Sequence, residues 1–218
     1  LLSRARVPFS YMWSSALLPK PVDWPPSTRV VGTYFVAQAA LQARGSQQLP
    51  AATFDETPFA SLMQWLGEGD APPIFVGFGS MVIEQPAALA LVIMRAARAS
   101  GRRVLVQSGW SKLEVGSEPL CFEVGPCPHE WLLPKVCAVV HHGGAGTTAA
   151  GLARGLPTLV CPFFGDQHMW GELVHRAGAG PPPCPISLLS AERLSGVGCR
   201  TPMRRNSCDV CAVCAPRR

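Results

Sequence analysis

One stretch of the sequence, residues 138–152, combines residue types that suit the binding of an anion. It reads AVVHHGGAGTTAAGL, so an apolar run is followed by paired histidines, glycines and paired threonines. Glycines let the backbone approach a ligand closely. A helix that starts near Gly146 would present free N–H groups and the positive end of its dipole. His142, Thr147 and Thr148 would add side-chain donors. We therefore predict a phosphate site, in preference to a buried turn in which glycines serve only packing.

The elements around this stretch alternate between apolar runs and helical patterns. Short apolar runs are typical of strands buried on both faces of a sheet. The predicted strands cover residues 73–78, 103–107, 120–124, 138–141 and 158–162, and the predicted helices cover residues 61–66, 85–100, 129–133, 146–155 and 165–177. In the longest helix Ala87, Leu91, Met94 and either Ala97 or Arg98 follow the helical period, so we expect this stripe to face the core. In the first helix we expect the same of Leu62, Met63, Trp65 and Leu66. This alternation predicts an α/β fold with a Rossmann-like, doubly wound parallel sheet.

Polar or glycine-rich loops follow four of the predicted strands. They are Gly79-Ser80, residues 108–110, residues 142–144 and residues 164–167. Ligands of such sheets bind at the carboxyl ends of the strands, so we predict a nucleotide site on this rim. A dinucleotide-binding fingerprint is excluded, because Gly77 and Gly79 are followed by Val82 where the third glycine is required.

Charge and cysteine content indicate which partners and which redox compartment fit this protein. The chain has 19 basic and 14 acidic residues, and six of the arginines with two of the acids fall from Ala191 onward, which leaves a body of charge +1. A nearly neutral body argues against nucleic acid as a partner. Four cysteines lie in apolar surroundings and are expected to be buried free thiols of a reducing compartment. They are Cys121, Cys127, Cys137 and Cys161.

The sequence divides into three parts. Residues 1–35 are proline-rich and predict an interdomain linker with a β-like run at 29–35, in which Trp24 is an anchor. Residues 36–194 hold the predicted domain, with a loop at 37–58. Residues 195–218 predict a disordered, Cys/Arg-rich tail, whose Cys-x-x-Cys spacing has a zinc or iron–sulfur site as the less favoured alternative. The first residues show neither an initiator Met nor a signal-peptide pattern, so we expect a cut into a longer protein.

The order of the motifs resembles the donor-binding signature of the UDP-sugar-dependent glycosyltransferases, and within them that of the sterol 3-beta-glucosyltransferases. The motifs are PHEWLLP at 128–134, HHGGAGTT at 141–148, GLP at 155–157 and PFFGDQ at 162–167. Three further stretches, at 21–25, 77–81 and 107–111, are similar to the sterol subgroup. The likeness runs from about Pro8 to Leu194. It implies the C-terminal half of a GT-B fold, in which two Rossmann-like domains face each other across a cleft.

The resemblance also implies a role for each motif. Those assigned to the diphosphate are Ser80, His142, Gly144, Gly146 and Thr147. Asp166 and Gln167 are implied at the sugar hydroxyls, and the backbone of His129 at the uracil edge. The uracil-stacking Trp of plant-type members falls near Pro126 here, so Trp110 is the candidate to replace it. The position of their ribose-binding Glu is occupied by Ala150.

The implied activity is inverting transfer of a hexose from UDP-glucose or another UDP-sugar to a sterol or similar lipid hydroxyl. The catalytic base is expected in the other domain, which also holds the acceptor, and neither a metal nor a cofactor is expected. A protein of the cytoplasm, either free or in peripheral contact with a membrane, fits this role. The alternative is a nucleotide-sugar-binding module without activity, and Asp166 and Ser80 each have the further alternative of being helix caps.

Overall fold

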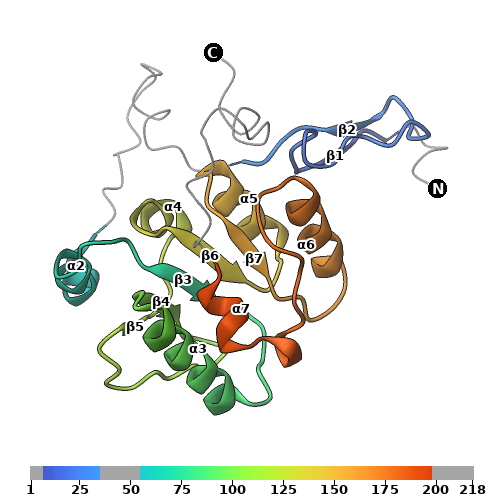
Figure 1. Cartoon of the computed structure of the whole chain (residues 1–218). Helices are drawn as coiled ribbons and strands as arrows, with labels where there is room; N and C mark the ends of the chain where they lie inside the picture. The colour runs from blue at the N-terminus through green and yellow to red at the C-terminus, as the bar shows by residue number, and fades with distance from the viewer. Residues whose placement is uncertain (1–6, 35–54, 198–218) are drawn as a thin grey trace.

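The computed structural model describes residues 7–34 and 55–197 of the 218-residue chain, and its body is a five-stranded parallel sheet (Figure 1). The strands lie in the order β5-β4-β3-β6-β7. Their bounds are β3 Ile74–Gly77, β4 Val104–Gln107, β5 Cys121–Val124, β6 Ala138–His141 and β7 Thr158–Val160. All of the predicted strands are present with small differences at their ends, and the predicted parallel sheet is confirmed.

The order of the strands reverses beside β3. The chain passes from β3 to β4 and β5 on one side and then returns to place β6 on the other side. Gly77 and His141, the last residues of β3 and β6, are register partners. Loops that leave two such strands diverge and open a crevice, which is where ligands of this sheet type bind. The fold therefore places the β3 and β6 loops at the position of a ligand site.

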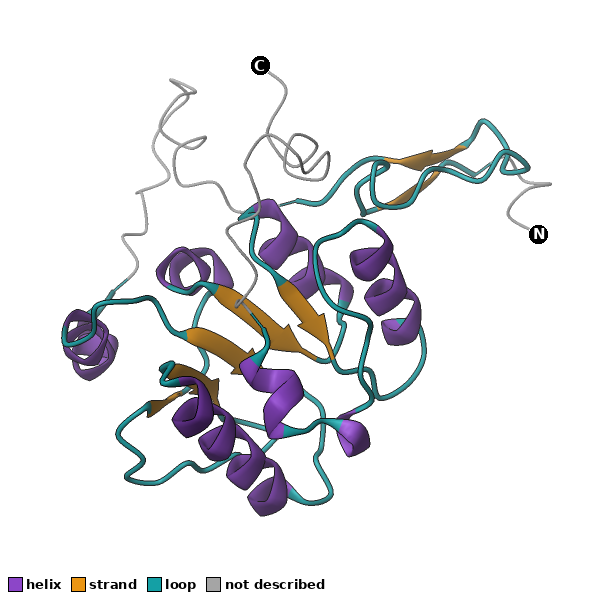
Figure 2. Ribbon diagram, in the orientation of Figure 1, coloured by secondary structure: helices purple, strands orange, loops and turns teal. Residues whose placement is uncertain are grey.

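Helices cover both faces of the sheet (Figure 2). The α-helices are α2 Ala60–Gly67, α3 Pro86–Ser100, α4 His129–Leu132, α5 Ala145–Ala153, α6 Gln167–Arg176 and α7 Ala191–Ser195, and the 3-10 helices are η1 Thr57–Phe59, η2 Leu133–Lys135 and η3 Ile186–Leu188. Side chains alternate along a strand, so Ile74 and Val76 share a core with residues of α3 and α7, whereas Phe75 shares one with residues of α2, α4 and α5. No helix in the described part of the chain has the length and apolar character to cross a bilayer.

The buried faces of α2 and α3 differ in part from the prediction. Of the residues expected to face inward on α3, only Ala97 is buried, while Leu91 is 50% exposed. The residues that α3 buries are Leu89, Ala90, Ile93, Ala96 and Ala97. Apolar residues of α3 occur on every side of the helix, so their spacing in the sequence does not identify the face that is buried. On α2, Leu62 is buried as predicted but Met63 is exposed.

Helical structure continues past the predicted domain boundary at residue 194. The hydroxyl of Ser190 accepts a hydrogen bond from the Arg193 N–H (3.3 Å) and caps α7. Leu194 and Val197 are buried in the core that contains α3. The prediction for the tail from residue 198 onward, with Cys199, Cys208, Cys211 and Cys214, lies outside the described residues, as does most of the predicted loop at 37–58.

Residues 7–34, here called the N-terminal arm, form a small structure of their own beside α5 and α6 (Figure 1). Strand β1 Phe9–Tyr11, which the sequence did not predict, pairs in parallel with β2 Thr28–Val30. Trp24, the predicted anchor, stacks on Tyr11 within the arm (ring centroids 4.5 Å). The ring that reaches the body is that of Trp13, which meets Trp170 of α6 edge-on at 6.1 Å.

Candidate functional site

The loop after β6 brings His142 against the start of α5. Gly143 has a φ of +92°, and a Cβ at this residue would lie 2.7 Å from Val160 Cγ1, so only glycine fits the turn. Gly144 is the N-cap residue of α5, and a Cβ there would lie 2.5 Å from His142 Nε2. The imidazole therefore lies directly over the backbone from which the helix begins.

The first turn of α5 leaves backbone donors for a ligand. Its first intrahelical bond runs from the Thr148 N–H to the Gly144 carbonyl (2.9 Å), so the amides of residues 145–147 precede the hydrogen-bonded ladder. A Cβ at Gly146 would meet nothing within 4 Å, which shows that this residue faces open space. Together with the helix dipole, these amides form a site for an anion.

The two threonines of the motif have different environments. Thr147 is half-buried in the first turn of α5. Thr148 is buried, and its hydroxyl donates to the Gly144 carbonyl (2.9 Å). The expectation that Thr148 donates to a ligand is therefore wrong, because its proton is used inside the helix. His142 and Thr147 are the side-chain donors that this turn can offer.

The loop after β3 forms the other wall around His142. Gly79 has a φ of +57°, and a Cβ there would lie 3.0 Å from His142 Cε1. Ser80 follows in the same turn and is exposed. Helix α3 has Gln85 as its N-cap residue, which excludes the alternative that Ser80 caps it. The imidazole of His142 thus lies between the β3 loop and α5, at the switch point of the sheet.

Electrostatic coupling links His142 to residues of two further loops. Burial lowers the pKa of His142, the nearby charge of His129 lowers it further, and the Asp166 carboxylate opposes both effects. The Nδ1 atom of His142 is buried and has no hydrogen-bond partner among the described residues. His129, whose pKa is also lowered by burial, begins α4 with its ring 5.7 Å from that of Phe75. His142 therefore lies within reach of the charges of two other predicted site residues, His129 and Asp166, which come from separate loops.

The two histidines of the motif, His141 and His142, have different roles. His141 is fully buried, and its Nδ1 accepts a hydrogen bond from the Gly143 N–H (3.0 Å). Burial lowers the pKa of His141 to about 3, so the ring stays neutral at ordinary pH. His141 fixes the glycine turn, whereas His142 faces the start of α5.

Asp166 and Gln167 also differ from each other. Asp166 is exposed at the N-terminus of α6, where it makes no side-chain capping bond; its Oδ2 instead accepts from Trp170 Nε1 (2.8 Å). Gln167 is buried, and its Oε1 accepts from the N–H groups of Phe163 (2.8 Å) and Phe164 (3.2 Å). The Asp166 carboxylate is therefore available on the rim, whereas Gln167 braces the β7 loop from within. Direct contact of Gln167 with a sugar stays a prediction.

Two positions bear on recognition of the nucleoside. Trp110 follows β4 and is 71% exposed, so its ring is free to stack, although the structure does not join it to the group around His142. Ala150 is buried in the core beneath α5 and offers no side chain to a ribose. The part of the chain that the structure describes holds no cluster of His, Cys, Asp or Glu suited to a metal ion.

Trp170 is a neighbour of the site that the sequence motifs did not include. Trp170 lies four residues after Asp166, a spacing that places two side chains on the same face of a helix. A buried indole N–H also needs an acceptor. That combination is a signal that could have identified the pair.

Comparisons with known proteins agree with the order of the motifs and with the fold. The profile of the family "Erythromycin biosynthesis protein CIII-like, C-terminal domain" matches residues 111–201. A sterol 3-beta-glucosyltransferase of Arabidopsis thaliana is 41% identical over 194 residues, which cover 88% of this chain and 28% of that protein. UDP-sugar-dependent glycosyltransferase 52 of Dictyostelium discoideum is 33% identical, over 87% of this chain and 12% of that protein. The chain thus spans less than a third of the length of these relatives.

Solved structures of glycosyltransferases share the fold. The glycosyltransferase of kitacinnamycin superposes with a TM-score of 0.63 at 18% identity and covers 87% of this chain and 44% of that one. The calicheamicin glycosyltransferase gives a TM-score of 0.59 at 18% identity, over 86% of this chain and 42% of that one. Motifs, fold and relatives agree: the chain is similar in sequence to a part of UDP-sugar-dependent and sterol glycosyltransferases, and it has the Rossmann-like fold of one part of the solved glycosyltransferase structures.

Proposed function

We propose that this chain binds a UDP-sugar, with UDP-glucose as the donor, as the donor half of an inverting glycosyltransferase that acts on a sterol or similar lipid hydroxyl. One observation carries the proposal: the ring of His142 lies over the unpaired amides that begin α5, at the switch point of the sheet. A diphosphate suits this arrangement of neutral and dipolar donors. The choice of glucose and of a sterol as substrates is supported by the name of a relative, which is a sterol 3-beta-glucosyltransferase.

The residues of this chain would act mainly on the leaving group. As the acceptor hydroxyl attacks C1 of the sugar, the C1–O bond to the diphosphate breaks and negative charge develops on UDP. The amides of residues 145–147 and the side chains of His142 and Thr147 would stabilise that charge through donors that are already in place. The base that removes the hydroxyl proton is expected in the acceptor domain.

A titration of the chain with UDP-glucose tests the binding half of the proposal. We expect calorimetry to show saturable heat with UDP and with UDP-glucose, and weaker binding of ADP-glucose, which shares the diphosphate and the sugar but not the base. A folded sample that gives no heat at millimolar UDP-glucose would refute the assignment.

The alternative is a binding module without transfer activity. The chain spans less than a third of its relatives, so we expect it to bind the donor but to transfer little sugar by itself. A sterol glucosylation assay with radiolabelled donor measures this directly. Robust transfer by the chain alone would show that the acceptor and the base are also held here.

Gly146 provides a prediction in which stability and binding change in opposite directions. A Cβ at Gly146 meets nothing within 4 Å, and the residue lies inside α5, so Gly146→Ala should stabilise the fold by about 0.5–1 kcal/mol. The added methyl group would stand where the diphosphate approaches the backbone, so the affinity for UDP should fall. Urea unfolding and UDP titration of the same variant test both parts, and a stabilised variant with unchanged UDP affinity would remove Gly146 from the site.

A further inference from the structure

The carboxylate of Asp166 is held by one oxygen. Its Oδ2 accepts from Trp170 Nε1 at 2.8 Å, while Oδ1 has no hydrogen-bond partner among the described residues. A hydrogen bond to an ionised carboxylate is among the stronger ones in proteins. The bond therefore selects one orientation of a side chain that is otherwise exposed on the rim, and it leaves the second oxygen open to a ligand.

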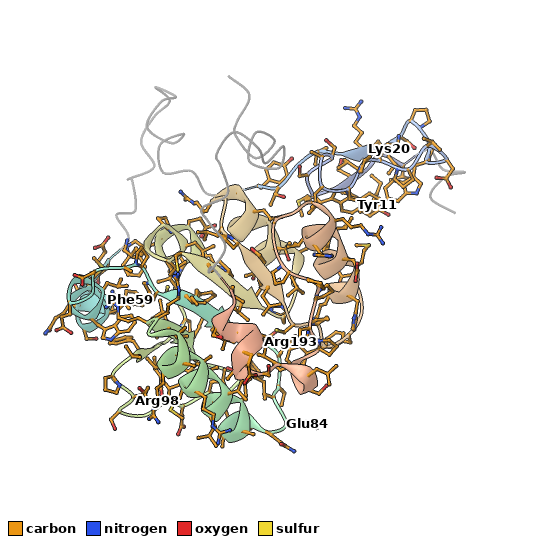
Figure 3. All side chains as sticks on the ribbon, in the orientation of Figure 1. Tyr11, Lys20, Phe59, Glu84, Arg98 and Arg193 are labelled. Carbon is orange, nitrogen blue, oxygen red and sulfur yellow. The ribbon has the colours of Figure 1, made fainter. Side chains whose placement is uncertain are left out.

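Trp170 is itself held in place by the N-terminal arm. Its side chain is 4% exposed, and the ring of Trp13 meets it edge-on at 6.1 Å. Trp13 is fixed in turn by a bond from its Nε1 to the Leu18 carbonyl (2.9 Å) and by a ring contact with Tyr11 at 4.5 Å. Tyr11 is labelled on the arm in Figure 3. A continuous set of contacts thus runs from the arm, through Trp13 and Trp170, to Asp166.

We propose that Trp170 is a positioning residue for Asp166 in sugar recognition, and that the arm contributes to sugar affinity by holding the ring of Trp170 through Trp13. The inference rests on the proposed function, in which Asp166 meets hydroxyls of the sugar. Sugar hydroxyls are recognised by acceptors at fixed positions, so a carboxylate free to rotate would bind them less well. UDP has no sugar, and its affinity is therefore the internal reference.

The first test is Trp170→Phe, which keeps an aromatic ring and removes the indole N–H. We expect the Kd of UDP-glucose to rise about three- to tenfold relative to that of UDP, the size of one lost hydrogen bond. Calorimetry on the 218-residue chain measures both ligands, and a melting curve reports on folding. Equal weakening of UDP and UDP-glucose would mean that Trp170 supports the domain as a whole, and would overturn the proposal.

A double-mutant cycle asks whether Trp170 acts through Asp166. Asp166→Ala should weaken UDP-glucose selectively, and adding Trp170→Phe to it should cause no further change in the ratio of the two affinities. Additive losses would overturn the positioning role. Selective loss in Asp166→Ala but none in Trp170→Phe would overturn this inference alone, whereas a parent chain that fails to bind UDP-glucose would overturn the proposed function as well.

The contribution of the arm is tested with a variant that leaves α6 unchanged. This variant also tests the proposal if Trp170→Phe does not fold. Trp13→Leu removes the ring that contacts Trp170 and should raise the Kd of UDP-glucose about two- to fivefold relative to UDP. Val22→Ala, in the same arm, is the control, because the side chain of Val22 is fully exposed and lies outside the set of ring contacts that leads to Trp170. An unchanged ratio in Trp13→Leu, or an equal change in Val22→Ala, would contradict the role of the arm.

Discussion

Replacing His142 by alanine is expected to weaken UDP and UDP-glucose by the same factor. The ring lies over the first turn of α5, where the diphosphate common to both ligands is proposed to bind. Loss of one hydrogen bond to a charged group corresponds to about 1.5–3 kcal/mol, or roughly ten- to a hundredfold in Kd. Calorimetric titration of each ligand into His142→Ala measures the two factors.

The exposed histidine His168, on α6, provides the matched control for this variant. His168→Ala should bind both ligands as the parent chain does. The Nδ1 atom of His142 has no partner among the described residues, so removing the ring leaves no buried group of the protein newly unpaired. If His142→Ala affected only UDP-glucose, the imidazole would belong to the sugar site and not to the diphosphate site.

The parts of the fold that the sequence predicted well are those fixed by local signals. Apolar runs bounded by turn residues marked all five strands of the sheet, and Gly101 marked the end of α3 by its left-handed conformation (φ +63°). The inward face of α3 was wrong because a helix with apolar residues on all sides is oriented by its neighbours. In the arm, the sequence predicted a β-like run at 29–35 but did not predict β1. The reason is that the parallel pair between β1 and β2 depends on contacts between residues far apart in the chain.

In the candidate site, too, the sequence predicted some features, whereas others depend on the folded structure. Motif order predicted which loops meet, and the charges of His129 and Asp166 both reach His142. It could not predict which side chains are used inside the protein, as the hydroxyl of Thr148 and the amide of Gln167 are. Those bonds depend on the exact path of the backbone. Thr147 and Thr148 have the same side chain, so the sequence alone does not show which of the two hydroxyls is bonded inside the helix.

His141 is expected to make the fold sensitive to acid. In the unfolded chain a histidine takes up a proton near pH 6.5, whereas burial lowers the pKa of His141 in the folded protein to about 3. Between these values the unfolded state binds more protons, so the free energy of unfolding must fall as the pH falls. The loss should approach roughly 1.4 kcal/mol per pH unit below about pH 6, and urea unfolding at pH 7.5, 6 and 5 measures it.

The variant that tests this origin is His141→Asn, whose side-chain oxygen can still accept the bond that the Gly143 N–H makes to Nδ1. It should be less stable than the parent at pH 7.5, because the smaller side chain leaves a cavity in the core. The decisive quantity is the slope of the free energy of unfolding against pH, which should decrease in His141→Asn. His129 and His142, whose pKa values are also lowered by burial, account for the slope that is left. A slope as steep in His141→Asn as in the parent would show that the acid sensitivity arises from those two rings, and that the buried histidine is not its source.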